Sequence, residues 1–224
     1  MNKHLLYCIS KEQPTRDLPA LDGAALRWIK IKNLFVASGE VPNDISTNLA
    51  NLAYGYQQIA QLLHKEINFL PLPFPTTIFH DQLKVLLERN GAQINSLIAK
   101  YGSFSEHSLQ VVPLNTNLSI PRGLMGDQKG LSYLRDKHKN FLTKEVLQDL
   151  AGLVSDSADK VLSENFLGAT FQHKERSINV HLLCNKKQGL TQHQLDKLRG
   201  ALESVATIKE IGVFPPFHFV SFKP

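Results

Sequence analysis

The chain has 224 residues, of which 42% are apolar and 20% are charged. This length excludes a large multidomain machine, and a charged fraction below the roughly 25% of an average domain argues against a disordered or supercharged chain. No apolar run reaches the roughly 18 residues that span a bilayer. The first ten residues also lack the apolar core and cleavage site of a signal peptide. We therefore expect a folded, cytoplasmic protein.

The beginning of the chain predicts three strands and then a helix. Apolar runs at 5–9, 26–31 and 34–37 are typical of strands, and Lys32-Asn33 between the last two suits a tight hairpin. From Asp44 onward, apolar residues recur at helical spacing over about twenty residues. Asp44 or Ser46 is the candidate N-cap of this helix.

The next segment is dominated by proline. A brief strand is predicted at 67–70, and it runs into Pro71, Pro73 and Pro75, which lack amide donors and exclude a helix. We interpret this segment as a rigid crossover. A second helix is predicted from Asp81 to Lys100, relaxed near Asn90-Gly91, and a strand follows at 108–114.

These elements predict an α+β protein of two domains. Residues 1–113 suit a ferredoxin-like sheet with two helices on one face, followed by an irregular linker at 115–129. Residues 114–224 suit a second α+β domain that ends in an aromatic tail. The elements predicted in this second domain are a long helix at 131–162 with a break near 151–152, strands at 166–171 and 178–183, a helix at 191–205 and a strand at 207–213.

The net charge of +5 is concentrated in the second half of the chain. Between Arg122 and Lys144, six basic residues accompany only Asp127 and Asp136. Such a segment can hold phosphates or an acidic partner, but its leucines and Phe141 recur at helical spacing, which favours a solvated helix face. No aromatic residues alternate with the basic ones in a nucleic-acid-binding pattern, so we expect no nucleic-acid partner.

The sequence contains no recognisable catalytic or metal-binding motif. Cys8 and Cys184 lie in separate apolar stretches, which predicts buried free thiols. The nine histidines show no metal-ligand spacing, although His173 and His181 stay open as a pair that meets across a hairpin. No GxSxG or GxxxxGK[ST] motif is present. We therefore predict no catalytic residue, no cofactor and no metal.

The C-terminal tail is unusually aromatic. Phe214-Pro215-Pro216-Phe217 is followed within five residues by Phe219 and Phe222, and the two prolines hold the backbone extended. Such a tail either docks on its own domain or presents aromatic anchors to a partner. The segment 71–76 has the same two interpretations.

Four segments, in order, resemble the gas vesicle accessory protein family F/L (GvpF/GvpL). Leu5-Leu6-Tyr7 is similar to the opening strand of the family, and 69–76 is similar to its "lPlrFGT" segment, with Glu106 in the following "g..E..v.V" strand. Residues 130–137 resemble the "G.aYL..k" helix start, and 212–220 resemble the closing "GPWPPYsFV". Together these segments span nearly the whole chain.

This chain departs from the family pattern at two of the segments. Pro73-Phe74-Pro75 stands where the family has Arg-Phe-Gly, so a basic side chain and a glycine are both replaced by rigid rings. Phe214 and Phe217 stand where the family has Trp and Tyr, which keeps the apolar bulk and loses two hydrogen-bonding groups.

The resemblance implies a non-enzymatic protein of the gas vesicle, an organelle whose wall is a polymer of a small hydrophobic subunit. It implies an assembly factor or minor structural component associated with the wall, with the wall subunit and other accessory proteins as partners and no lipid membrane. The candidate partner-binding residues are Leu72, Phe74, Tyr133, Leu134, Arg135, Phe214, Pro215, Pro216, Phe217 and Phe219. The alternative is a two-domain binding or regulatory module, unrelated to vesicles, that recognises a small ligand or an anionic partner.

Overall fold

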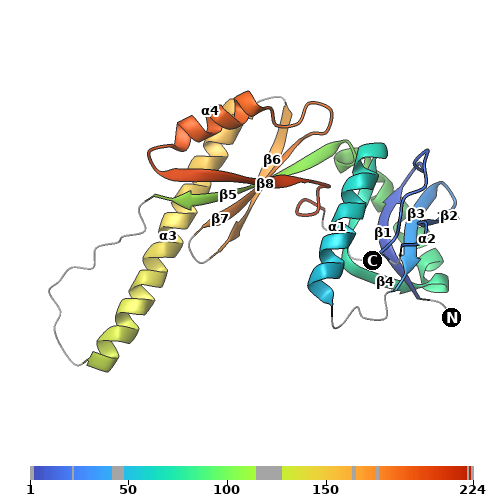
Figure 1. Ribbon diagram of the computed structural model, residues 1–224, viewed down its shortest axis with the longest axis horizontal. Coiled ribbons are helices and arrows are strands. Elements are labelled where there is room, and N and C mark those ends of the chain that lie inside the picture. Colours follow the sequence, from blue (N-terminus) through green and yellow to red (C-terminus); the bar gives the residue numbers. More distant parts are fainter. Residues whose placement is uncertain are drawn as a thin grey trace. The chain divides into compact units, whose positions relative to one another are not determined.

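The computed structural model describes residues 3–21, 23–41, 48–114, 128–162, 165–174, 177–220 and 222, with the backbone alone for 128–143. Figure 1 shows the elements along the chain. They are β1 (Lys3–Ser10), β2 (Arg27–Ile31), β3 (Leu34–Glu40), α1 (Leu49–Glu66), β4 (Phe69–Phe79), α2 (His80–Tyr101), β5 (Phe104–Pro113), α3 (Gln128–Leu162), β6 (Phe166–His173), β7 (Ile178–Asn185), α4 (Gln192–Leu202) and β8 (Ala206–Phe214).

The chain divides into two compact units, each built on a four-stranded sheet. The first unit contains residues 1–106, 185–187 and 213–224, and the second contains 107–184 and 188–212. This division differs from the predicted boundary at 113/114, because it falls within β5. It also assigns the aromatic tail to the first unit rather than to the second.

The first sheet is antiparallel and has the strand order β2-β3-β1-β4. Its two helices cover opposite faces. Tyr56, Ile59 and Leu63 of α1 belong to one core cluster, whereas Leu83, Leu87, Ile94 and Ile98 of α2 belong to another. The prediction of two helices on one face is therefore wrong.

The central strand β1 explains why both faces need cover. Leu5 and Tyr7 pack into the α1 cluster, and Leu6 and Ile9 pack into the α2 cluster. Alternate side chains of a strand point to opposite faces, so a strand that is apolar at consecutive positions must be buried on both. Between Leu6 and Cys8 the pairing register shifts at a bulge.

The proline segment is part of a strand, and not the crossover that the sequence predicted. β4 runs from Phe69 to Phe79 through Pro71, Pro73 and Pro75, at the edge of the sheet. An edge strand has one side without a partner strand, so prolines there cost few ladder hydrogen bonds. Pro71 pairs with Cys8 and Thr76 with Leu6, so the four residues 72–75 stand opposite Tyr7 alone. We call these four residues the β4 bulge.

The hydroxyl of Tyr56 holds this irregular region together. It lies 2.7 Å from the carbonyl oxygen of Leu72, and 3.1 and 3.0 Å from those of Leu6 and Tyr7. Burial raises the pKa of Tyr56 well above its usual range, so the hydroxyl keeps its proton and donates it. One buried donor therefore lies among carbonyl groups of both strands beside the bulge.

The second unit, rather than the first, has ferredoxin-like topology. Its chain order is β5-α3-β6-β7-α4-β8, and its antiparallel sheet has the order β6-β7-β5-β8. This is the split β-α-β arrangement of ferredoxin-like folds. The first unit has the order β1-β2-β3-α1-β4-α2, so the predicted ferredoxin-like domain at 1–113 is corrected.

The two helices of the second unit pack into one core cluster. Apolar residues recur every three or four positions along the C-terminal half of α3, and again along α4, where a capping box formed by Thr191 and Gln194 begins the helix. α3 is continuous through Ala151-Gly152, so the predicted break there is wrong. The buried helix residues are Leu147, Leu150, Val154, Ala158, Leu162, Leu195, Leu198 and Leu202.

Several predictions fall on residues that the structure does not describe. These are most of the linker at 115–129 and the side chains of the basic segment up to residue 143. Asp44 and Ser46 also lie outside the described residues, but α1 begins at Leu49 with Asn48 as its N-cap, so the predicted N-cap is wrong. Both cysteines are buried and free, as predicted. His181 pairs with Thr170 and His173 with Ile178, so the two histidines are not cross-strand partners. Within the described ranges, no helix is both long and apolar enough to cross a bilayer.

We expect Tyr56→Phe to lower the free energy of unfolding by about 1–3 kcal/mol, because it removes a buried donor that lies within hydrogen-bond distance of three carbonyl groups at the bulge. Urea denaturation measures this change. Tyr54→Phe is the matched control, since Tyr54 is on the same helix and 65% exposed. Equal unfolding midpoints for the two variants would contradict the role of the hydroxyl.

Candidate functional site

The aromatic tail is fixed to the first unit at several points. Pro215 and Pro216 are buried, and a turn follows in which the amide of Phe217 donates to the carbonyl of Pro215 over 2.7 Å. Phe217 packs against the α1 cluster, and Val220 and Phe222 pack with the α2 cluster. The tail therefore reaches both faces of the first sheet.

Glu106 is the polar anchor of the tail. Its side chain is 1% exposed, and one carboxylate oxygen accepts a hydrogen bond from the backbone amide of His218 over 3.0 Å. The other oxygen lies 2.7 Å from Nδ1 of the same histidine. A carboxylate that accepts from both the backbone and the ring of one residue fixes that residue in place and in orientation.

Three aromatic rings lie in succession beside the β4 bulge. Tyr7 and Tyr56 are stacked, with ring centroids 5.0 Å apart and an interplanar angle of 12°. Phe74 is tilted by 48° against Tyr56 at a centroid distance of 5.1 Å. Phe74 and Phe217 both pack against the α1 cluster while staying only partly buried. The fold thus brings a residue of the bulge and a residue of the tail to the same cluster.

The predicted partner-binding residues have different degrees of exposure. Phe74, Phe214, Phe217 and Phe219 are partly exposed, and we call these four side chains the tail surface. Leu72, Pro215 and Pro216 are buried, and Leu72 packs into the α2 cluster, on the face opposite to that of Phe74. Tyr133, Leu134 and Arg135 lie on α3, and their side chains are outside the described residues.

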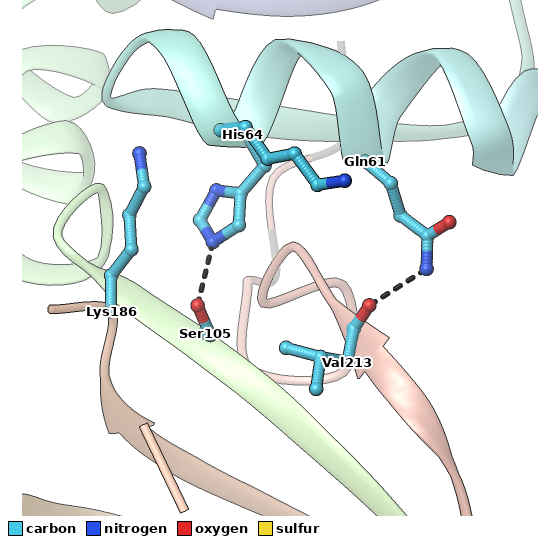
Figure 2. Close-up of a pocket in the computed structure, with 6 residues that line it drawn as sticks. Gln61, His64, Ser105, Lys186 and Val213 are labelled. Atoms are coloured by element: carbon cyan, nitrogen blue, oxygen red, sulfur yellow. Dashed lines mark hydrogen bonds between the residues drawn. The ribbon is translucent and has the colours of Figure 1, made fainter. Parts of the chain in front are cut away.

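The first unit also contains a pocket of about 530 Å³ (Figure 2). It is lined by side chains from α1, from the start of β5, from the segment after β7 and from the end of β8, namely Gln61, His64, Lys65, Ser105, Lys186 and Val213. The side-chain amide of Gln61 donates to the carbonyl of Val213 over 2.7 Å. Nε2 of His64 lies 2.9 Å from the hydroxyl of Ser105.

Burial controls the charges in this pocket. Burial, together with the smaller effect of the Lys186 ammonium group, lowers the pKa of His64 to about 3, so the imidazole is neutral at neutral pH. Burial also lowers the pKa of Lys186, while the carboxylates of Glu12 and Glu66 act in the opposite direction. The Lys186 ammonium donates to the carbonyl of Ile67, the C-cap of α1, over 3.1 Å.

The sequence did not point to the pocket. His64 lies within the apolar periodicity of α1, where a histidine usually belongs to the core. Lys186 reaches the first unit from a part of the chain more than a hundred residues away, and its backbone amide donates to Ser103. No local pattern signals such a meeting.

The family model described as "Gas vesicle synthesis protein GvpL/GvpF" matches residues 3–221. The chain belongs to this family. Its match covers all four segments on which the resemblance depended, so the resemblance is confirmed. Membership in the GvpL/GvpF family favours the vesicle interpretation over a module unrelated to vesicles.

Solved structures agree with this assignment at the level of the fold. The crystal structure of the gas vesicle protein GvpF from Anabaena sp. PCC7120 is similar with a TM-score of 0.71 at 15% identity, over 100% of this chain and 98% of that one. GvpF from Microcystis aeruginosa is similar with a TM-score of 0.66 at 13% identity, over 99% of this chain and 100% of that one. A search of curated protein sequences finds no significant match.

We expect Glu106→Gln to loosen the tail, because an amide cannot accept from both groups of His218 as the carboxylate does. Hydrogen exchange of the backbone amides at 217–220 measures this, and we expect it to be about tenfold faster or more. Glu88→Gln, at an exposed position on α2, is the control. Unchanged exchange in Glu106→Gln would show that the apolar contacts alone hold the tail.

We expect the buried, neutral His64 to make the fold sensitive to acid. The unfolded chain takes up a proton at this residue near pH 6.5, and the folded protein does so only near pH 3. The contribution of the neutral His64 to the free energy of unfolding is therefore complete above pH 6.5 and is lost as the pH falls toward 3. His107, whose pKa burial lowers to about 4, contributes with the same sign in the second unit.

The measurement is the free energy of unfolding at about pH 7.5 and about pH 4.5. His64→Gln keeps a side chain that can bond Ser105, and we expect a smaller fall than in the wild type. His193→Gln, at an exposed position on α4, should leave the fall unchanged. An equal loss of unfolding free energy between the two pH values in all three proteins would contradict the role of His64 in acid sensitivity.

Proposed function

We propose that this protein is a non-enzymatic assembly factor or minor structural component of the gas vesicle, and that it binds the hydrophobic wall subunit through its tail surface. The proposal is supported most directly by the gathering of Phe74 and Phe217, from segments remote in sequence, on one core cluster with part of each ring exposed. Aromatic anchors on a rigid base are typical of binding surfaces.

The physical reason for such a factor lies in the wall subunit. A subunit that polymerises into a hydrophobic wall exposes apolar surface before it is incorporated, and that surface aggregates in water. A partner that covers part of it with aromatic side chains keeps it available for assembly. This role requires the protein to work in the cytoplasm, beside the growing wall and together with other accessory proteins.

The tail surface suits this role because it is held in place before binding. Glu106 fixes the chain next to Phe217, and the rings of Tyr7 and Tyr56 support Phe74. Side chains that are already ordered lose less conformational entropy when a partner binds. Tyr133, Leu134 and Arg135, in the segment that resembles the family's helix start, remain a second proposed contact.

The binding experiment dilutes the wall subunit from denaturant into buffer with or without this protein, and measures how much subunit stays in the supernatant. Phe214 and Phe219 are the residues to change first, because neither belongs to a described core cluster. We expect Phe214→Ser/Phe219→Ser to lower the soluble fraction severalfold, since two anchors worth about 1–2 kcal/mol each are lost.

Two further variants make the result specific. Val85→Ser removes an exposed apolar side chain from α2 and should keep full activity. Phe74→Leu/Phe217→Leu preserves the apolar packing and should lose less than Phe74→Ser/Phe217→Ser. If the folded Phe214→Ser/Phe219→Ser protein keeps the subunit as soluble as the wild type does, the tail surface is not the interface.

A further inference from the structure

The pocket of the first unit is not explained by the proposed binding of a wall subunit. Its lining includes the side chains of Lys65 and Lys186, and none of its lining residues is acidic. Figure 2 shows Lys186 and Ser105 on one side of the space, His64 above them on α1, and Gln61 bonded to Val213 across from them. The charged groups of the lining are therefore two cations and no anion.

We propose that this pocket is a binding site for a small oxyanion, a molecule bearing a carboxylate or a phosphate group. The ammonium groups of Lys65 and Lys186 supply the charge, and the hydroxyl of Ser105 and the amide of Gln61 supply hydrogen bonds. Charge-assisted hydrogen bonds from lysine are a general means of holding such groups. The neutral His64 takes part as the partner that orients Ser105.

Lys186 is placed for this role by the fold. Its backbone amide donates to the carbonyl of Ser103, and its ammonium donates to Ile67 at the end of α1, which leaves ammonium protons for a ligand. Burial disfavours its charged form, with Glu12 and Glu66 as partial compensation. An anion in the pocket would relieve the remaining cost, so binding and ionisation of Lys186 favour each other.

The size of the pocket limits the ligand. A volume of about 530 Å³ lies within the range of about 300–1,000 Å³ that is usual for small-molecule sites. It admits a metabolite or a phosphate with its water, and it does not admit a folded protein. None of the four tail-surface residues lines the pocket, and the test of the pocket does not depend on the wall subunit.

The experiment titrates isotope-labelled full-length protein with sodium phosphate, and separately with sodium citrate, at constant ionic strength maintained with sodium chloride. Amide shifts of Ser105 and Lys186 and the imidazole nitrogen shifts of His64 are the readout. We expect saturable shifts at these residues with at least one of the two anions. The anion that binds more tightly identifies the phosphate or the carboxylate class.

Variants decide whether the shifts come from the pocket. Lys65→Met and Lys186→Met should each weaken binding about tenfold or more, and Lys65 is exposed, so its replacement opens no core. Lys187→Met is the matched control, because Lys187 is exposed, adjacent in sequence and outside the pocket lining. Shifts that do not saturate with either anion, or that are equal in Lys65→Met and Lys187→Met, would overturn the proposal.

Discussion

The hydrogen-bonding position of Tyr56 is the constraint on which the first unit depends. Its hydroxyl lies within hydrogen-bond distance of carbonyl groups of both strands, at the place where the pairing of β1 and β4 shifts its register. Without a donor there, the low-dielectric interior makes such a bulge costly. With it, the bulge is stable and projects Phe74 beside the ring of Tyr56. One residue of α1 therefore links the two strands at the bulge and packs against an aromatic side chain of the tail surface.

The periodic parts of the fold could be predicted from the sequence, and the irregular parts could not. Apolar spacing predicts the helices α1, α2 and α4 and the strands β1, β2 and β3. An element that buries one face carries apolar residues at its own structural period, which the sequence shows directly. β4 was missed because prolines were interpreted as the end of a strand, although an edge position tolerates them. The opposite placement of α1 and α2 was signalled by the unbroken apolar run at 5–9, which indicates burial on both faces.

The same contrast applies to the sites. The aromatic tail could be singled out from the sequence because phenylalanine beside Pro-Pro is an unusual local pattern. A local pattern of this kind can be recognised without knowledge of the fold. The pocket depends on Lys186, which belongs to the first unit only because three residues of the chain leave the second unit and return to it. Gln61 and His64, which also line the pocket, lie on a helix with an ordinary amphipathic pattern. A site built from such distant segments can be recognised only when the topology of the chain is known.

The presence of Pro73-Phe74-Pro75 in the segment that resembles the family's Arg-Phe-Gly can be understood from the bulge itself. Residues 72–75 stand opposite Tyr7 alone, so the amide protons that two prolines remove have few ladder partners to lose. The bulge therefore accepts rings on both sides of Phe74, and these rings restrict the backbone of the unfolded chain as well as of the folded one. Relative to the family pattern that these segments resemble, the replacement removes a positive charge next to the aromatic side chain. In the proposed interface, Phe74 therefore contributes apolar contact and shape without a neighbouring cation, whereas Lys65 and Lys186 line the pocket.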